Sequence, residues 1–426
     1  MPLNEYPVWT KGIAVLPGEP GPLPERADVV VIGGGITGLA AARELARRGA
    51  AVALLESHTI GWGASSRNGG MVLSGLKLGV AKLIKVYGRD VAQRMFAASL
   101  DAIALVERIV DEEQIDCNFS RCGHLVVASK PEHYRGLADE ADLLEREFGH
   151  ATHLVPIERL GDEIGSAAFH GGIVDLASAG VQPAAYVLGL ATAARRAGAC
   201  LFDRTPAMTI ERKPGGFVVE TVRGSIQAKQ VLTATGGYTG PTTPALRRRI
   251  IPIGSYIIAT EPLPESLAHE LSPRGRMIYD TRNFLYYFRI TPDRRMLFGG
   301  RAGFFPETPS TVRASAEILR RGMIEVYPQL RGTRVEYAWG GNVDFTFDMM
   351  PHAGEQGGLQ YALGYAGHGV ALATYLGTQL GAGLAGAAIE NPFGQPLPGA
   401  PFGLYNGRPW FLPFAGIWYK FLDWVS

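Results

Sequence analysis

The chain has few cysteines and almost no net charge. Three cysteines, Cys117, Cys122 and Cys200, occur in 426 residues, and they neither form the even set of a disulfide scaffold nor have the spacing of a zinc site. With 41 Lys and Arg against 40 Asp and Glu, the net charge of +1 gives no electrostatic reason to expect nucleic acid or an anionic membrane as the main partner. We therefore expect a cytoplasmic protein with no bound metal and no nucleic-acid partner.

Targeting segments and several catalytic motifs are also missing from the pattern. Residues 1–27 lack a basic stretch followed by an apolar core, so we do not expect a secretory signal, and their prolines indicate an extended arm on the surface. No G-x-S-x-G, H-E-x-x-H or Cys/His ligand cluster occurs. Residues 362–389 are apolar enough to score as a membrane span, but the glycines at their start favour a buried helix.

A strand and a glycine-rich turn near the N-terminus organise the chain. Val29–Ile32 is a short apolar run rich in β-branched residues, which is typical of a strand buried on both faces. Gly33, Gly35 and Gly38 follow at the G-x-G-x-x-G positions. The first glycine permits a tight turn, the second lets backbone approach a pyrophosphate, and the third lets a helix pack closely on the strand.

The rest of a nucleotide-binding unit follows in order. Residues 37–48 have apolar side chains at helical spacing, Gly49 stands where such a helix would end, and residues 51–55 read as a second strand. That strand ends in Glu56, where an acidic side chain accepts hydrogen bonds from the ribose of an adenine dinucleotide. A carboxylate disfavours a 2′-phosphate, so the pattern predicts FAD or NAD with its pyrophosphate at the N-terminus of the helix.

Three later glycine-rich segments are placed to meet the same cofactor. Residues 57–75 are rich in glycine, serine and amides and would lie along the dinucleotide, an interpretation that we favour over a plain surface loop. Residues 234–240 form a glycine turn at the end of a strand-like run. Residues 364–370 begin the apolar helix, whose N-terminus would point at a flavin.

The pattern of strands and helices predicts two associated, discontinuous domains. The expected fold class is a Rossmann-type α/β domain interleaved with an α+β domain built on an antiparallel sheet, because strand-like runs with period-two alternation fill residues 250–339. The expected ranges are an N-terminal arm at 1–27, the cofactor domain at 28–115, 170–245 and 340–395, the substrate domain at 116–169 and 246–339, and an aromatic tail at 396–426.

Six motifs in a fixed order then resemble one family. They are GGGITG at 33–38 with Glu56, GASSRNGG at 63–70, ATGG at 234–237, RITPDRRMLFGGR at 289–301, the WGG…D…P pattern at 339–351 and GYAGHGV at 364–370. Together they look like the FAD-dependent D-amino-acid oxidase and glycine oxidase superfamily. Within it, the chain resembles most the γ-glutamylputrescine oxidoreductase and sarcosine-oxidase-like branch.

The resemblance implies an FAD domain, a substrate sheet that roofs the flavin, and oxidation of the C–N bond of an amine or amino acid, such as a γ-glutamyl polyamine or an N-methyl amino acid. Hydride would pass to flavin N5, and O2 is the expected acceptor, giving imine or aldehyde and H2O2. No cysteine stands in the turn at 364–367, so FAD is expected without a covalent bond. The implied FAD-binding residues are Gly33, Gly35, Ile36, Thr37, Gly38, Glu56, Ser65, Ser66, Arg67, Asn68, Gly69, Gly236, Gly367, His368, Gly369 and Val370.

Two of these residues are also candidates for catalysis. His368 is the one ionisable group in the apolar helix and could stabilise a reduced anionic flavin, or it could be a satisfied core histidine. Arg67 could lie at the flavin or at an acidic group of the substrate, or it could be an ordinary loop arginine in solvent.

The other candidates lie on the expected roofing strands. They are Tyr256, Tyr287 and Arg289, and strand alternation places Tyr287 and Arg289 on the same face. Simple sheet packing is the alternative for each tyrosine, and a salt bridge within the sheet is the alternative for Arg289 and for Arg301. No secure catalytic base is evident, and none is needed if the amine arrives deprotonated.

An alternative function concerns the electron acceptor. A membrane-associated flavin dehydrogenase would pass electrons to a quinone or carrier, and the aromatic tail at 410–424 could anchor it at an interface. We favour packing of this tail on its own protein or on a second subunit. The oligomeric state stays open.

Overall fold

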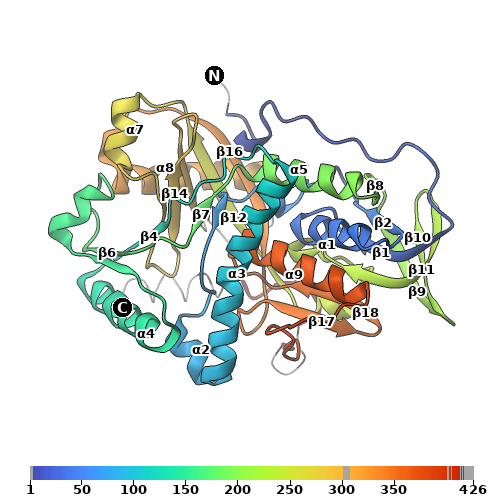
Figure 1. The fold of residues 1–426 in the computed structure, drawn as a ribbon. Coiled ribbons are helices and arrows are strands. Elements are labelled where there is room, and N and C mark those ends of the chain that lie inside the picture. The colour runs from blue at the N-terminus through green and yellow to red at the C-terminus, as the bar shows by residue number, and fades with distance from the viewer. Residues whose placement is uncertain are drawn as a thin grey trace.

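The protein is described here from a computed structural model, which covers residues 3–300, 308–400, 403, 405–412, 414 and 416. Two eight-stranded sheets form the two halves of the molecule, side by side (Figure 1). A two-stranded ribbon of β3 (Met71–Val72) and β7 (Ala179–Gly180) accompanies them.

The first sheet is the predicted parallel one, in the order β17-β18-β11-β1-β2-β8, with β10 and β9 attached as an antiparallel extension of β11. The five strands from β18 to β8 along this path are parallel to one another, whereas β17 is antiparallel to β18. The strands are β1 (Arg26–Ile32), β2 (Val52–Leu55), β8 (Cys200–Phe202), β9 (Ala207–Lys213), β10 (Gly216–Thr221), β11 (Gly224–Thr233), β17 (His352–Gln356) and β18 (Leu359–Leu363).

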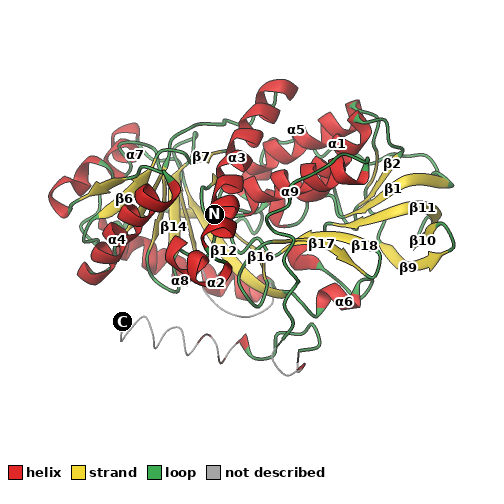
Figure 2. Cartoon of the chain, turned by 60° about the horizontal axis from the view of Figure 1, so that its bottom comes forward, coloured by secondary structure: helices red, strands yellow, loops and turns green. Residues whose placement is uncertain are grey.

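Helices α1 (Ile36–Arg47), α5 (Pro183–Arg196) and α9 (Gly369–Leu384) gather on one side of this sheet, next to the long α3 (Arg89–Glu113) (Figure 2). Helix α9 lies against α1 so closely that a Cβ on Gly377 would be 2.3 Å from the carbonyl oxygen of Thr37. The apolar run that resembled a membrane span is therefore a buried helix of the core. Among the described residues, no helix combines the length and the apolarity that crossing a membrane requires.

The second sheet has the order β16-β12-β15-β14-β13-β4-β6-β5. It is mostly antiparallel, as predicted, but β13 and β4 pair in parallel, which the sequence pattern did not indicate. Its strands are β4 (His124–Val127), β5 (His153–Val155), β6 (Gly172–Asp175), β12 (Ile251–Thr260), β13 (Met277–Asp280), β14 (Tyr286–Ile290), β15 (Met296–Gly300) and β16 (Val335–Phe345).

Sheet membership moves two expected domain boundaries. Two of the three ranges expected for the cofactor domain were 170–245 and 340–395. Strand β6 lies inside the first of them and the end of β16 inside the second, yet both strands belong to the second sheet. Both strands pair with partners far away in sequence, namely β4 with β6 and β12 with β16, so local pattern could not assign them.

Helix α8 (Pro309–Val326) covers one face of the second sheet, where a core of aliphatic and aromatic side chains includes Tyr256, Phe288 and Phe298. The opposite face meets the first half of the molecule through Ile257, Leu297 and Trp339. The remaining helices are α2 (Val80–Tyr87), α4 (Pro131–Phe148), α6 (Pro244–Arg247) and α7 (Glu265–Leu271), with 3-10 turns η1 (Val8–Thr10), η2 (Ala64–Ser66), η3 (Ile157–Asp162), η4 (Gly236–Tyr238) and η5 (Pro328–Leu330).

The helical segment from residue 80 to 113 is divided into two helices, α2 and α3. Gly88 lies between α2 and α3 with φ of 79°, a left-handed value that favours glycine and breaks the helical hydrogen-bond ladder.

The N-terminal arm runs across both halves of the molecule, as the dark blue trace shows (Figure 1). It begins beside β16, where Asn4 bridges to Tyr337, and reaches the first sheet, where the amide of Glu19 donates to the carbonyl of Leu201. Part of the arm is on the surface, as expected, but Trp9 is only 4% exposed. The arm is therefore partly a core element.

Candidate active site

The carboxyl ends of the parallel strands β1, β11 and β2 bring three turns to one edge of the first sheet. A Cβ on Gly33, after β1, would be 2.6 Å from the carbonyl oxygen of Ala234, after β11. The amide of Gly34 donates to Oε2 of Glu56, after β2, over 2.7 Å. Ligands of open α/β sheets bind at this edge, so the predicted glycine turns meet where a dinucleotide is expected.

The N-terminus of α1 shows how the glycines form a cradle. Gly35 is the N-cap of α1, and a Cβ there would be 2.7 Å from Oγ of Ser65. That same Oγ accepts the amide of Ile36 over 3.0 Å, so a hydroxyl lies at the helix N-terminus, where an anion would bind. A Cβ on Gly38 would be 2.0 Å from the carbonyl oxygen of Gly33, which explains why this position requires glycine.

Glu56 ties the first turn to the start of the next segment. Besides accepting from Gly34, it receives the amide of His58 over 2.8 Å and the hydroxyl of Ser57 over 3.1 Å, both at Oε1. The side chain is buried at the end of β2. Its carboxylate thus stands at the position expected for ribose binding and also stabilises the glycine turn.

Asn68 shapes the segment of residues 64–70 from within. Its Nδ2 donates to the carbonyls of Ala64 and Ser65 over 3.1 and 2.9 Å, and its Oδ1 accepts the amide of Gly70 over 2.8 Å. The side chain was expected to approach the flavin, but these contacts use it inside the loop. Contact with a cofactor would come from the backbone that it holds.

Arg67 is not an arginine in open solvent. Its Nε donates to the carbonyl of Trp62 over 2.9 Å and its Nη1 to the carbonyl of Gly340 over 3.1 Å. The guanidinium lies 4.7 Å from the centre of the Trp62 ring. Arg67 therefore links the 64–70 segment to β16 of the second sheet.

A second helix N-terminus faces the same edge. Gly367 is exposed with φ of 100°, and His368 is the N-cap of α9 without a side-chain capping bond. The preceding turn is held by Asp344, whose Oδ2 accepts the amide of Gly364 over 2.6 Å. The hydroxyls of Tyr365 and Thr37 lie 2.8 Å apart, so the N-termini of α9 and α1 converge.

Of the two alternatives for His368, a charged group beside the flavin and a core histidine, the burial of its imidazole favours the second. Burial, together with the nearby Lys77 and His124, lowers the pKa of His368 to about 3, so its imidazole is neutral at pH 7. Its Nδ1 is buried and has no hydrogen-bond partner among the described residues. The unpaired amides at the N-terminus of α9 are the better source of partial positive charge, since their dipoles add there.

Tyr287 and Arg289 share the face of the second sheet that meets the 64–70 segment, as strand alternation predicted. A Cβ on Gly69 would be 3.2 Å from the Tyr287 ring, and the Tyr287 hydroxyl lies 3.0 Å from Oγ of Ser255. Arg289 donates from Nη1 to the carbonyls of Gly70 and Val181 over 3.2 and 3.0 Å.

Arg289 is a buried cation, and among the described residues no acidic side chain forms an ion pair with it. Its Nε has no acceptor there either, and burial lowers the pKa of its guanidinium to about 10, which leaves it charged at pH 7. Among the described residues, Arg289 therefore does not form the salt bridge within the sheet that was the alternative for it. Arg301 lies outside them.

Tyr256 is a correction to the expected site. It is 2% exposed and packs in the core under α8, with its hydroxyl 3.4 Å from Oγ1 of Thr311. In the antiparallel register Tyr256 pairs with Gly300, and its neighbour Ile257 occupies the opposite face. The structure therefore places Tyr256 away from the 64–70 segment.

Three residues beyond those predicted contribute to the arrangement. Asp344 holds the turn before α9, Tyr365 joins α9 to α1, and Trp9 donates from Nε1 to the carbonyl of Asn68 over 2.8 Å. The acid within the WGG…D…P pattern was a usable signal for Asp344. Trp9 follows no periodic pattern, so only the folded arrangement reveals it.

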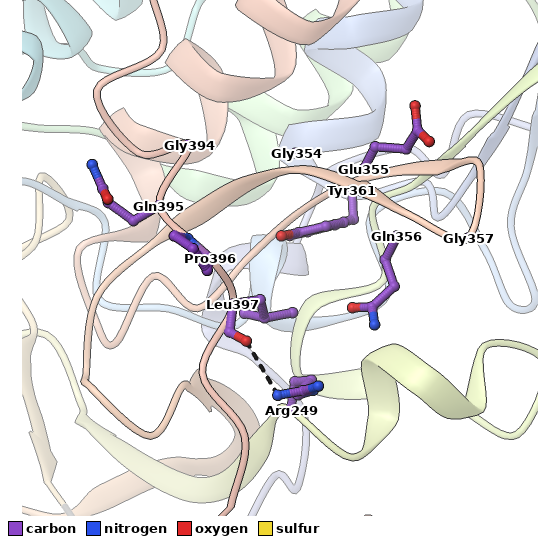
Figure 3. A pocket seen from close by; sticks show the side chains of 10 residues that line it. All are labelled: Arg249, Gly354, Glu355, Gln356, Gly357, Tyr361, Gly394, Gln395, Pro396 and Leu397. Carbon is purple, nitrogen blue, oxygen red and sulfur yellow. Dashed lines mark hydrogen bonds between the residues drawn. The ribbon is translucent and has the colours of Figure 1, made fainter.

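A cavity of about 420 Å³ lies elsewhere, beside the β17–β18 hairpin (Figure 3). Arg249, Glu355 and Tyr361 contribute side chains to it, and Arg249 donates to the carbonyl of Leu397 over 3.2 Å. None of its lining residues is a predicted site residue, and the hairpin turn stands at the end of β18 opposite Gly364. We do not assign the cavity to the cofactor.

The site has the donors that FAD requires. A parallel sheet carries two converging helix N-termini, a glycine cradle and a terminal carboxylate at its carboxyl edge, which defines a Rossmann-type dinucleotide-binding domain. Among the described residues, no cluster of His, Cys, Asp or Glu could hold a metal ion.

Comparison with known proteins identifies the class further. The model of the DAO family, FAD dependent oxidoreductase, matches residues 28–382, so the chain belongs to this family and uses FAD. It is 36% identical over 379 residues to the "Probable oxidoreductase OrdL" of Rhizobium meliloti (strain 1021), covering 88% of this chain and 85% of that protein. It is 31% identical over 392 residues to the γ-glutamylputrescine oxidoreductase of Escherichia coli (strain K12), covering 92% and 90%.

Among solved structures, the glycine oxidase of Geobacillus kaustophilus has a TM-score of 0.74 at 22% identity, covering 87% of this chain and 98% of that one. This likeness confirms the predicted fold, with a Rossmann-type FAD domain and several sheets. The family and the cofactor that the six motifs implied are confirmed as well.

Proposed function

We propose that this FAD-dependent oxidoreductase oxidises the C–N bond of a small amine or amino acid, with O2 as electron acceptor. The observation that carries the proposal is the contact between the Tyr287 and Arg289 face of the second sheet and the 64–70 segment at the carboxyl edge of the first. The names of two relatives, a γ-glutamylputrescine oxidoreductase and a glycine oxidase, support the same substrate class.

The residues of the first sheet would hold the cofactor at its two ends. The N-terminus of α1, with Ser65, would bind the pyrophosphate and Glu56 the ribose. Bound FAD would supply a hydride acceptor at flavin N5. Amides at the N-terminus of α9, after Gly367, would face the negative charge that reduction adds, because a helix N-terminus favours anions.

Arg289 favours a substrate that carries a carboxylate. A buried guanidinium without an acidic partner among the described residues is costly unless an anion compensates it. An amino acid or a γ-glutamyl conjugate of a polyamine would bring such a group. A salt bridge of that kind would orient the substrate while the amine remains free to react.

No protein base is needed if the amine binds in its neutral form. His368 is neutral at pH 7, and its buried Nδ1 could accept a hydrogen bond from the amine without carrying charge. The protein would mainly orient the substrate and exclude water.

Anaerobic reduction of the purified holoenzyme tests the proposal. γ-Glutamyl polyamines, N-methyl amino acids and primary amino acids would be mixed with it while flavin absorbance is followed. Bleaching by at least one class is expected, and a flavin that no member bleaches would contradict the proposed reaction. Oxygen uptake with H2O2 release on admission of air supports O2 as acceptor.

A second candidate is a membrane-associated dehydrogenase that passes electrons to a quinone or carrier. The observation that favours it is the exposure of Trp410 at 62% and of Phe414 at 68% in the described part of the tail. Liposome flotation with and without residues 396–426 distinguishes the two. Tail-dependent binding together with quinone reduction and no oxygen uptake would favour the dehydrogenase.

We also propose that FAD is held without a covalent bond. In the turn before α9, the Tyr365 hydroxyl is engaged with Thr37, and the chain offers no cysteine there. Acid precipitation should release all of the yellow colour into the supernatant, and colour in the pellet would show a covalent link.

A further inference from the structure

Three side chains that lie outside the first sheet donate hydrogen bonds to backbone carbonyls of residues 67–70. Nε1 of Trp339 donates to the carbonyl of Arg67 over 2.8 Å, and Nε1 of Trp9 donates to the carbonyl of Asn68 over 2.8 Å. Nη1 of Arg289 donates to the carbonyl of Gly70 over 3.2 Å. Three carbonyls of one short segment therefore point toward the second sheet and the arm.

The amides of the same segment are less occupied. The amide of Gly70 donates to Oδ1 of Asn68, whereas the amides of Asn68 and Gly69 have no acceptor among the described residues. Free amides next to a glycine without a side chain are donors of the kind that a flavin or a phosphate accepts. Fixing the carbonyls from one side therefore also fixes where these amides point.

Trp9 is the donor that comes from the N-terminal arm. It is buried with Trp339, Ile257 and Leu297 on the face of the second sheet that meets the loop. The guanidinium of Arg289 lies 5.9 Å from the centre of its ring. Trp9 thus touches two of the groups that define the loop, the carbonyl of Asn68 and the side chain of Arg289.

The arm holds Trp9 in place on both sides. The carbonyl of Trp9 accepts Nε2 of Gln182 over 2.7 Å, while Oε1 of the same Gln182 caps α5 by accepting the amide of Ala185 over 2.8 Å. Before Trp9, Asn4 is bonded to β16 through the amide of Ala338. The arm precedes residue 28, where the match to the family model begins.

We propose that Trp9 is a positioning residue of the FAD site, through which the N-terminal arm fixes the carbonyl of Asn68 and so aims the amides of the 67–70 segment at the cofactor. The inference rests on the proposed contact of this segment with FAD. It does not depend on the identity of the substrate, because Trp9 acts on the backbone of the loop.

Trp9→Phe is the decisive variant, since it keeps an aromatic ring beside Arg289 and removes the indole N–H together with the pyrrole part of the ring. The measurements are the FAD dissociation constant of the apoprotein, from flavin fluorescence, and hydrogen–deuterium exchange of the peptide covering residues 64–72. We expect the dissociation constant to rise at least about tenfold and exchange of the loop amides to quicken, since the Asn68 carbonyl loses its donor.

Val8→Ala is the matched control. Val8 is buried in the same cluster of the same arm, and the structure gives its side chain no hydrogen bond to the loop. It should lower thermal stability while leaving the FAD dissociation constant and loop exchange at their wild-type values. If Val8→Ala changes FAD binding as much as Trp9→Phe does, or if Trp9→Phe changes neither readout, Trp9 is a packing residue and the proposal is wrong.

Gln182→Glu provides a second test if Trp9→Phe does not fold. Glutamate keeps an acceptor for the amide of Ala185 but removes the donor to the Trp9 carbonyl, so it should shift FAD binding and loop exchange in the same direction. Wild-type values for this variant would overturn the proposal. A protein that binds FAD as expected but oxidises no amine would contradict the proposed function and leave the role of Trp9 intact.

Discussion

Gly35→Ala tests the position of the pyrophosphate with the least disturbance of the protein. Gly35 has φ of −87° and ψ of −173°, an extended conformation that alanine adopts without strain. The added Cβ would be 2.7 Å from Oγ of Ser65, and the next nearest atom, Cβ of Ser65, would be 3.7 Å away. The apoprotein therefore has one contact to relieve, with a hydroxyl that can rotate.

The cost to the apoprotein follows from that rotation. Oγ of Ser65 now accepts the amide of Ile36, and turning it away loses one hydrogen bond at a helix N-terminus, about 1 kcal/mol. A bound pyrophosphate cannot turn away in this manner if it lies over Gly35. We expect the FAD dissociation constant to rise at least about tenfold, which corresponds to about 1.4 kcal/mol.

Two assays separate these effects. Urea unfolding of the apoprotein gives the free energy of unfolding, and titration with FAD gives the dissociation constant. Gly38→Ala is the control, because its Cβ would be 2.0 Å from the backbone oxygen of Gly33, and backbone cannot rotate away. We expect Gly38→Ala to destabilise the apoprotein by about 1–3 kcal/mol or more, through strain between α1 and β1.

Two results would contradict these expectations. A Gly35→Ala protein that loads FAD stoichiometrically at the wild-type dissociation constant would show that the pyrophosphate does not approach Gly35. A Gly38→Ala apoprotein as stable as wild type would show that the close approach of α1 to the turn is not required.

Three further predictions concern the same site and its support. Arg67→Ala should keep bound FAD but slow anaerobic flavin reduction at least about tenfold, because it removes the hydrogen bonds that join the loop to Trp62 and Gly340; stopped-flow reduction at the wild-type rate would leave Arg67 no part in the chemistry. Glu56→Gln should raise the FAD dissociation constant, measured by titration, since one carboxylate acceptor becomes a donor. Burial lowers the pKa of His124 to about 4, below its value of 6.5 in the unfolded chain. Between these two pH values the unfolded state binds more protons than the folded state. The free energy of unfolding should therefore fall as the pH drops from 6.5 to 4, by up to about 3 kcal/mol. Urea unfolding from pH 7 to 4 should show this slope, His124→Gln should make it less steep, and an unchanged slope would contradict the assignment to His124.

Local sequence was sufficient where the structure depends on near neighbours. The first strand, glycine turn and helix of the cofactor unit lie where the pattern predicted them, because each signal acts within a few residues. Helix α5 begins at Pro183, because proline is favoured in the first turn of a helix.

Local sequence failed where side chains depend on distant partners. The face on which Tyr256 lies is set by the pairing of β12 with β15 and β16, and no property of the strand alone identifies which face meets the cofactor.

Helix α9, the apolar helix at the C-terminal end of the cofactor domain, has one property that local sequence shows and one that depends on a distant partner. Its small residues raised the question of a membrane span, and the same residues explain its place in the site. A Cβ on Gly377 would be 2.3 Å from the carbonyl oxygen of Thr37, and one on Gly381 would be 2.7 Å from that of Ala41, so two positions four apart on α9 match two positions four apart on α1. The sequence displays the spacing of the glycines but not the helix that they meet. Because that helix is α1, close packing brings the N-terminus of α9 beside the glycine turn, and two N-terminal dipoles that are 333 residues apart in sequence converge on the edge of the sheet where we propose that FAD binds.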